Sequence, residues 1–144
     1  HQGKVTKGTL KAGEAGILQI DAYRRAAITR NHTAAHLLQR ALREVLGNHV
    51  HQAGQLVDDH RVRFDFNHFG PMTPSEIAQV ECIVNEKILE GLPVNITEMS
   101  REEAQKIGAM ALFNEKYGDR VRVVNAGDYS IELWIQLQSS GCLR

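Results

Sequence analysis

The sequence contains few residues that cross-link or stiffen a chain, and neither sign of charge is in excess. Cysteine occurs only at Cys82 and Cys142, too few for a disulfide framework, so we expect an intracellular, cytoplasmic location. Basic residues number 17 and acidic residues also number 17, which excludes a polyelectrolyte tail and leaves nucleic-acid contact to a local patch. No apolar run approaches the roughly 18 residues of a membrane span, so we expect no membrane partner.

The length and the first residues suggest one folding unit from a longer chain. A chain of 144 residues is the size of a single domain and can bury its own core. It begins at His1 without a methionine and enters an apparent strand at once, so we expect a fragment. In residues 3–30, short stretches with apolar residues lie on either side of the turn-prone segment 11–14. This pattern predicts short β-structure.

The most informative stretch is a predicted helix that carries two histidines. Apolar residues recur at helical spacing between Ala34 and Leu46, which predicts one buried stripe. A cap at Thr29 or Asn31 would begin this helix and Gly47 would end it.

The two histidines, His32 and His36, lie four residues apart, so both imidazoles leave the same side of the helix, about 40° from each other. Two adjacent imidazoles can bind one metal ion, although histidines at this spacing are also found as solvated or hydrogen-bonded side chains. A zinc protease is disfavoured, because Thr33 stands where the His-Glu-x-x-His motif carries its general base.

Arginines precede the histidines and form a small basic cluster in the sequence. Arg24, Arg25 and Arg30 could contact phosphate, and the alternative is an ordinary solvated face.

The remaining chain alternates between predicted hairpins and short helices. Residues 50–57 and 61–66 predict a hairpin, in which Gly54 marks a bulge or a close backbone approach. Capping boxes at Thr73 and Ser100 predict two further helices, the first ending at Gly91. Strands are predicted at 93–98, 121–124 and 129–133. This order predicts an α+β fold with a mostly antiparallel sheet packed with helices.

Several collinear motifs resemble the editing domain of alanyl-tRNA synthetases, which is shared with free-standing trans-editing proteins and, more distantly, with threonyl-tRNA synthetase. The similarity covers nearly the whole chain. The motifs that carry it are Arg30-Asn31-His32-Thr33-Ala34, Arg61–Phe66 with Asn67-His68-Phe69, Val84–Ile88, Gly108–Phe113 with Glu115–Gly118, and Val121–Val124 with Ser130–Leu133.

The resemblance implies a two-layer editing fold and an aminoacyl-tRNA deacylase. Residues 1–30 would be the end of a small β-domain, and residues 31–144 the editing core. The expected reaction hydrolyses the aminoacyl ester of Ser-tRNA-Ala and Gly-tRNA-Ala, with the tRNA-Ala acceptor end and the remainder of the synthetase as partners. The resemblance makes His32 and His36 zinc ligands and gives Gln52 a catalytic role. Substrate contacts are expected from Thr33, Arg24, Arg25 and Arg30.

The second half of the expected zinc site departs from the family pattern. Alignment on Ser130–Leu133 puts Trp134 where the family has a cysteine ligand and Gln138 where it has a histidine. Cys142 is a remote substitute on spacing alone. The alternative hypothesis is therefore a catalytically inert, metal-free tRNA-binding module of the same fold.

Overall fold

A computed structural model describes residues 4–9, 11–109 and 120–134; for Leu133 and Trp134 it describes the backbone only. The elements in chain order are α1 (Ala22–Leu46), β1 (Gln52–Val57), β2 (Val62–Phe66), α2 (Pro74–Leu89), β3 (Val94–Ser100), α3 (Arg101–Lys106), β4 (Arg120–Ala126) and β5 (Ser130–Trp134). β1 pairs with β2, and β4 lies between β3 and β5, with every pair antiparallel. The predicted α+β class is confirmed.

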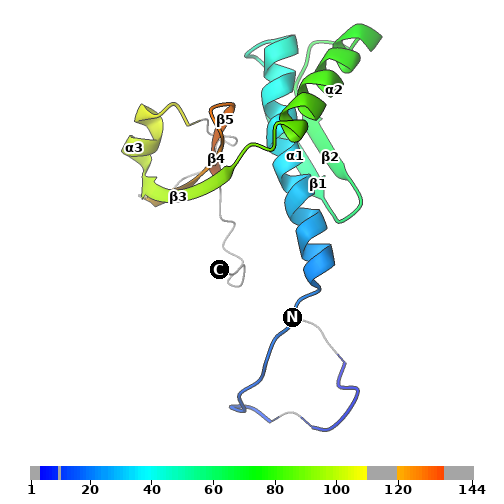
Figure 1. The fold of residues 1–144 in the computed structure, drawn as a ribbon, viewed down its shortest axis with the longest axis vertical. Coiled ribbons are helices and arrows are strands. Elements are labelled where there is room, and N and C mark those ends of the chain that lie inside the picture. The colour runs from blue at the N-terminus through cyan, green and yellow to red at the C-terminus, as the bar shows by residue number, and fades with distance from the viewer. Residues whose placement is uncertain (1–3, 10, 110–119, 135–144) are drawn as a thin grey trace.

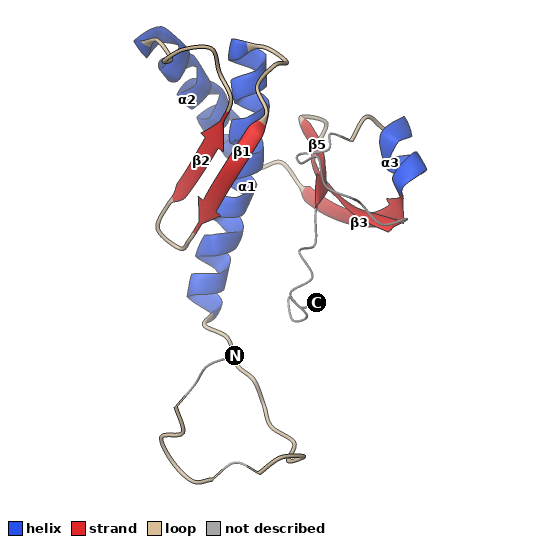
Figure 2. Cartoon of the chain, turned by 180° about the vertical axis from the view of Figure 1, so that it is seen from behind, coloured by secondary structure: helices blue, strands red, loops and turns tan. Residues whose placement is uncertain are grey.

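The helix α1 occupies the middle of the molecule (Figure 1). The hairpin β1–β2 and α2 lie to one side of it, and the sheet β3–β4–β5 with α3 lies to the other (Figure 2). The three-stranded sheet contacts α1 through β5. Each sheet packs against helices, which is the predicted two-layer arrangement. No helix among the described residues is both long enough and apolar enough to cross a membrane.

The helix α1 begins earlier than predicted. Its cap is Asp21, whose carboxylate accepts the Arg24 N–H over 3.0 Å, rather than Thr29 or Asn31. The Thr29 hydroxyl instead donates to the Arg25 carbonyl over 2.9 Å and remains inside the helix. The end at Gly47 is as predicted: its φ is 112°, and its N–H bonds to the Arg43 carbonyl.

The β-structure predicted over residues 3–30 is wrong where the structure describes it. The described residues before Ala22 lie in no strand, and those from Ala22 onward belong to α1. The turn at 11–14 is present, because the Glu14 N–H bonds to the Lys11 carbonyl. Ile17 and Leu18, whose apolar side chains suggested a strand, are 97% and 93% exposed and pack against no core. The domain boundary at residue 30 stays a prediction.

The hairpin β1–β2 follows the prediction closely. Its register shifts between Gln52 and Gly54, the bulge that the glycine indicated. A Cβ on Gly54 would lie 3.1 Å from Asp65 Oδ2 on the paired strand, so the close approach is present too. Phe64 and Phe66 share one face and pack on the core of α1 and α2.

The two predicted capping boxes are confirmed. Thr73 caps α2 and exchanges hydrogen bonds with Glu76, and Ser100 caps α3 in the same way with Glu103. The predicted apolar stripe of α2 is only partly buried. Val80 is buried and Ile83 and Val84 pack against the core, whereas Ile77 and Ile88 are each 51% exposed.

Candidate functional site

The two histidines of α1 lie together, as their spacing predicts. The ring centres of His32 and His36 are 4.9 Å apart and the ring planes are inclined at 84°. The His36 side chain is only 11% exposed, and His32 is partly buried. The helix therefore presents two imidazoles edge to face in a sheltered position.

Burial keeps His32 in its neutral form. Desolvation, and secondarily the nearby His36, lower the pKa of His32 to about 4. A neutral imidazole is the form that coordinates a metal ion or accepts a proton. At neutral pH His32 therefore offers a lone pair to a metal ion, whereas its low pKa makes it a weak proton acceptor.

A third residue, Glu132 of β5, joins this pair. Its Oε2 atom meets Nδ1 of His36, and its Oε1 atom accepts the Ser130 hydroxyl over 3.1 Å. Glu132 is 1% exposed, and a buried carboxylate is costly unless hydrogen bonds compensate it. The strand itself was predicted from the sequence, but no role was predicted for Glu132. The available signal was the alternation that places Ser130 and Glu132 on one face of the strand.

The described residues do not complete a zinc site. Two neutral imidazoles suit zinc as donors, but no group of three or more His, Cys, Asp or Glu side chains in the described part of the chain is arranged to hold a metal ion. Trp134 ends β5, two residues after Glu132, and an indole offers no metal lone pair. Gln138 and Cys142 lie outside the described residues.

The side chain of Gln52, predicted to be catalytic, is buried at the start of β1. It is 8% exposed, and its Nε2 atom has no hydrogen-bond acceptor among the described residues. Two residues earlier, the Val50 carbonyl accepts the Gln39 amide and the Arg43 guanidinium, both from α1. These bonds hold the start of β1 against α1 and leave a buried amide donor available to a ligand.

Two of the predicted substrate-binding residues line one cavity. Thr33 and Arg30 border a cavity of about 400 Å³ between α1, the end of α2 and the three-stranded sheet. Lys87 of α2 contributes a second cation to its wall. The Thr33 hydroxyl donates to the Thr29 carbonyl over 3.2 Å, and Thr29 lines the same cavity.

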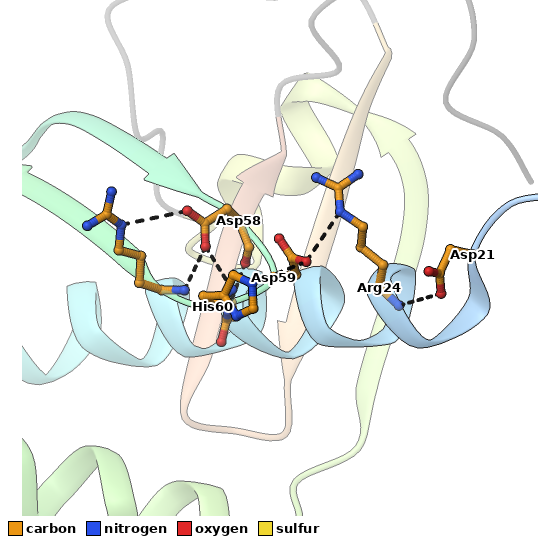
Figure 3. Close-up of polar contacts among 7 residues, drawn as sticks. Asp21, Arg24, Asp58, Asp59 and His60 are labelled. Atoms are coloured by element: carbon orange, nitrogen blue, oxygen red, sulfur yellow. Dashed lines mark hydrogen bonds and ion pairs between the residues drawn. The ribbon is translucent and has the colours of Figure 1, made fainter. Parts of the chain in front are cut away.

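The other predicted arginines lie elsewhere. Arg24 Nε lies 3.3 Å from Asp59 Oδ2 in the β1–β2 turn, so it tethers the start of α1 to that turn (Figure 3). The neighbouring Asp58 carboxylate accepts the N–H groups of His60 and Arg61, which hold its pKa below the usual range.

Arg24 and Arg30 are six positions apart, which places them about 120° from each other around the helix axis. Arg25 is exposed on the first turns of α1. The arginines that look like one cluster in the sequence therefore do not form one surface.

Comparison with known proteins identifies the relatives of this chain. No protein-family model matches it. The alanine–tRNA ligase of Acetivibrio thermocellus is 62% identical over 133 residues, that of Lachnoclostridium phytofermentans 59%, and that of Bacillus subtilis 53% over the same length. The homologues of this chain are alanine–tRNA ligases. Each match covers 92% of this chain and 15% of the ligase.

The chain thus spans about 15% of the length of the ligases it matches. A segment of 15% carries only part of such an enzyme, so the similarity alone does not assign a step of the ligase to it.

Proposed function

We propose that this chain is the editing segment of an alanine–tRNA ligase. It would hydrolyse the ester bond that joins a wrong amino acid, serine or glycine, to the terminal ribose of tRNA-Ala. The observation that carries the proposal is the sheltered pair His32–His36 at the contact of α1 with β5, in a chain 62% identical to an alanine–tRNA ligase. A cytoplasmic location belongs to the same proposal.

In this proposal the histidines are the ligand pair for zinc. His32 and His36 would hold the ion, with further ligands from outside the described residues. Zinc, when bound, polarises an ester carbonyl and lowers the pKa of a water molecule. His32 contributes a nitrogen that stays unprotonated at neutral pH.

The other predicted residues would bind and orient the substrate. The buried Gln52 amide, which lacks an acceptor among the described residues, can donate to an ester or a developing oxyanion. Thr33 and Arg30 line a cavity that suits the terminal nucleotide, with a hydroxyl for the ribose and a cation for phosphate. Arg24 and Arg25 would approach the backbone of the acceptor end from the exposed start of α1.

A second candidate function is an inert, metal-free tRNA-binding module. The specific observation in its favour is Trp134, which stands in β5 at the position where the resemblance requires a cysteine ligand. Such a module would keep the arginine contacts to tRNA and would lack hydrolysis.

The deciding experiment measures hydrolysis of Ser-tRNA-Ala by the purified chain, with and without a chelator and with zinc added back. His32→Ala is the test variant, and His60→Ala is the matched control because its side chain is 88% exposed in the β1–β2 turn. Editing predicts chelator-sensitive hydrolysis that is lost in His32→Ala and kept in His60→Ala. Hydrolysis at the protein-free rate in every sample would contradict it.

A double substitution distinguishes two explanations of an inactive chain: loss of the metal site, and absence of another part of the ligase. Trp134→Cys with Gln138→His restores the two ligand types that the resemblance requires. Hydrolysis by this variant alone would support the inert module as the present state of the chain. Binding of tRNA-Ala without hydrolysis, in both the chain and this variant, would place catalysis in parts of the ligase outside this segment.

A further inference from the structure

The contact between Glu132 and His36 joins β5 of the three-stranded sheet to the central helix α1. We propose that Glu132 is a positioning residue: by accepting the Nδ1 proton of His36, it fixes one tautomer of the neutral ring and leaves the lone pair on Nε2. This inference deepens the proposed deacylase function and rests on it for its purpose. The geometry that supports it stands independently of any reaction.

The contact is built from buried groups on two elements. His36 is 11% exposed on α1, and Glu132 is 1% exposed on β5. The two carboxylate oxygens are used separately, Oε2 by His36 Nδ1 and Oε1 by the Ser130 hydroxyl at 3.1 Å. Because Ser130 is itself 3% exposed, the carboxylate is held at both oxygens inside the protein. Its orientation toward the imidazole is therefore fixed.

The carboxylate of Glu132 selects the tautomer of His36 through its hydrogen-bonding character. An ionised carboxylate only accepts hydrogen bonds, so the imidazole nitrogen that meets it must carry a proton. In a neutral ring the other nitrogen, Nε2, is then the one with the lone pair. A group that only filled space at this position would leave the ring free to adopt either tautomer.

A carboxylate behind a histidine has a chemical consequence at the opposite nitrogen. It orients the ring and fixes which nitrogen carries the lone pair, whether that nitrogen binds a metal ion or accepts a proton. Glu132 would thus orient His36 for ligand binding.

The test is the tautomer of His36, read by two-bond ¹H–¹⁵N correlation spectra of the metal-free chain with ¹⁵N-labelled histidine. Spectra are recorded at about pH 8, where an ordinary imidazole is neutral. Signals are assigned by comparison with His32→Asn and His36→Asn. We expect the Nδ1–H form of His36 in the wild type.

Substitutions of the carboxylate then test the cause. In Glu132→Gln the amide can donate as well as accept, so the Nε2–H share should rise roughly fivefold as a charge-assisted bond becomes a neutral one. Glu132→Asp keeps the carboxylate and should retain more of the Nδ1–H form than Glu132→Gln. Glu102→Gln, an exposed carboxylate on α3, is the control and should leave His36 unchanged.

The wild-type spectrum can overturn the inference without any variant. An Nε2–H ring, or a ring protonated on both nitrogens at this pH, would contradict it. An Nδ1–H ring that persists unchanged in a folded Glu132→Gln protein would also contradict it. Because no tRNA is present, these results are separate from deacylation: an Nδ1–H ring in an inactive chain leaves the positioning intact and removes only the proposed function.

Discussion

The hydroxyl of Tyr129, in the turn between β4 and β5, donates to the Glu44 carboxylate of α1 over 3.5 Å. The Lys87 ammonium of α2 lies 5.1 Å from the centre of the same ring, and the Arg40 guanidinium lies 6.0 Å from it. Burial, together with Glu44, raises the pKa of Tyr129 to about 12, so the phenol keeps its proton at neutral pH. One side chain thus connects the three-stranded sheet with both long helices.

Removing this ring should loosen the sheet from the helices. We expect Tyr129→Ala to lower the free energy of unfolding by about 1–2 kcal/mol, because a partly buried aromatic ring and two cation–π contacts are lost. Tyr129→Phe keeps the ring and should cost less, since the hydroxyl contact is long. Urea unfolding followed by far-UV circular dichroism measures both. Tyr23→Ala is the control, because Tyr23 is 91% exposed; an equal loss in Tyr23→Ala would contradict the role of Tyr129.

The turn that carries Tyr129 depends on Gly127. Its φ is 56°, and a Cβ there would lie 3.1 Å from Leu92 Cδ2. We expect Gly127→Ala to destabilise the fold by about 1–2 kcal/mol, because the left-handed backbone and the close approach both penalise a side chain. Gly127→Asn should reduce stability less, because asparagine adopts the left-handed backbone conformation more readily than alanine. In thermal unfolding Gly70→Ala serves as control, since a Cβ at Gly70 meets nothing within 4 Å.

The capping box of α2 should make stability depend on acid pH. The Thr73 backbone N–H and hydroxyl both donate to Glu76, at 2.7 and 2.8 Å, and these bonds lower the pKa of Glu76. A carboxylate whose pKa is lowered by folding stabilises the fold at pH values above its pKa in the unfolded chain, which is 4.5. This contribution disappears as the pH falls through the lower pKa of the folded state. Glu76→Gln should therefore flatten the acid limb of the stability curve.

The matched control for this prediction is Glu81→Gln, a carboxylate of the same helix outside the capping box. Its curve should keep the acid limb of the wild type. Thr73→Ala should lower stability by about 1 kcal/mol at neutral pH, as for other lost helix caps. Identical acid limbs in wild type and Glu76→Gln would show that the capping bond contributes nothing.

Features that depend on near neighbours in the sequence could be predicted. The capping boxes at Thr73 and Ser100 and the bulge at Gly54 each involve residues within one turn or one hairpin, where backbone chemistry dictates the outcome. The start of α1 was misplaced for a local reason too. Thr29 and Asp21 are both suitable caps, and the helix is capped by Asp21, the one nearer the N-terminus.

The contact of Glu132 with His36 could not be predicted in the same way. Glu132 and His36 are 96 residues apart in the sequence, and only the packing of β5 on α1 brings them together. The paired histidines were predictable because four residues fix their geometry on a helix. The carboxylate behind them is set by tertiary structure, as is the ion pair of Arg24 with Asp59.

The separation of the arginines leads to a last prediction, on RNA binding. Arg30 borders the cavity with Thr33 and Lys87, whereas Arg24 is occupied by Asp59. If the acceptor end enters this cavity, Arg30→Ala should weaken tRNA-Ala binding and reduce the slope of log K against log salt by about 1. Arg24→Ala should change the slope less, because its guanidinium already faces a carboxylate.

Binding is measured by fluorescence anisotropy of labelled tRNA-Ala over about 50 to 200 mM salt, the range in which counterion release is readily seen. Unfolding curves of both variants exclude a loss of structure; the exposed Arg24–Asp59 pair should contribute at most about 1 kcal/mol. A larger salt effect in Arg24→Ala than in Arg30→Ala would move the RNA path from the cavity to the exposed start of α1. Equal effects would mean that the two arginines act on tRNA as one surface, despite lying on different sides of the helix.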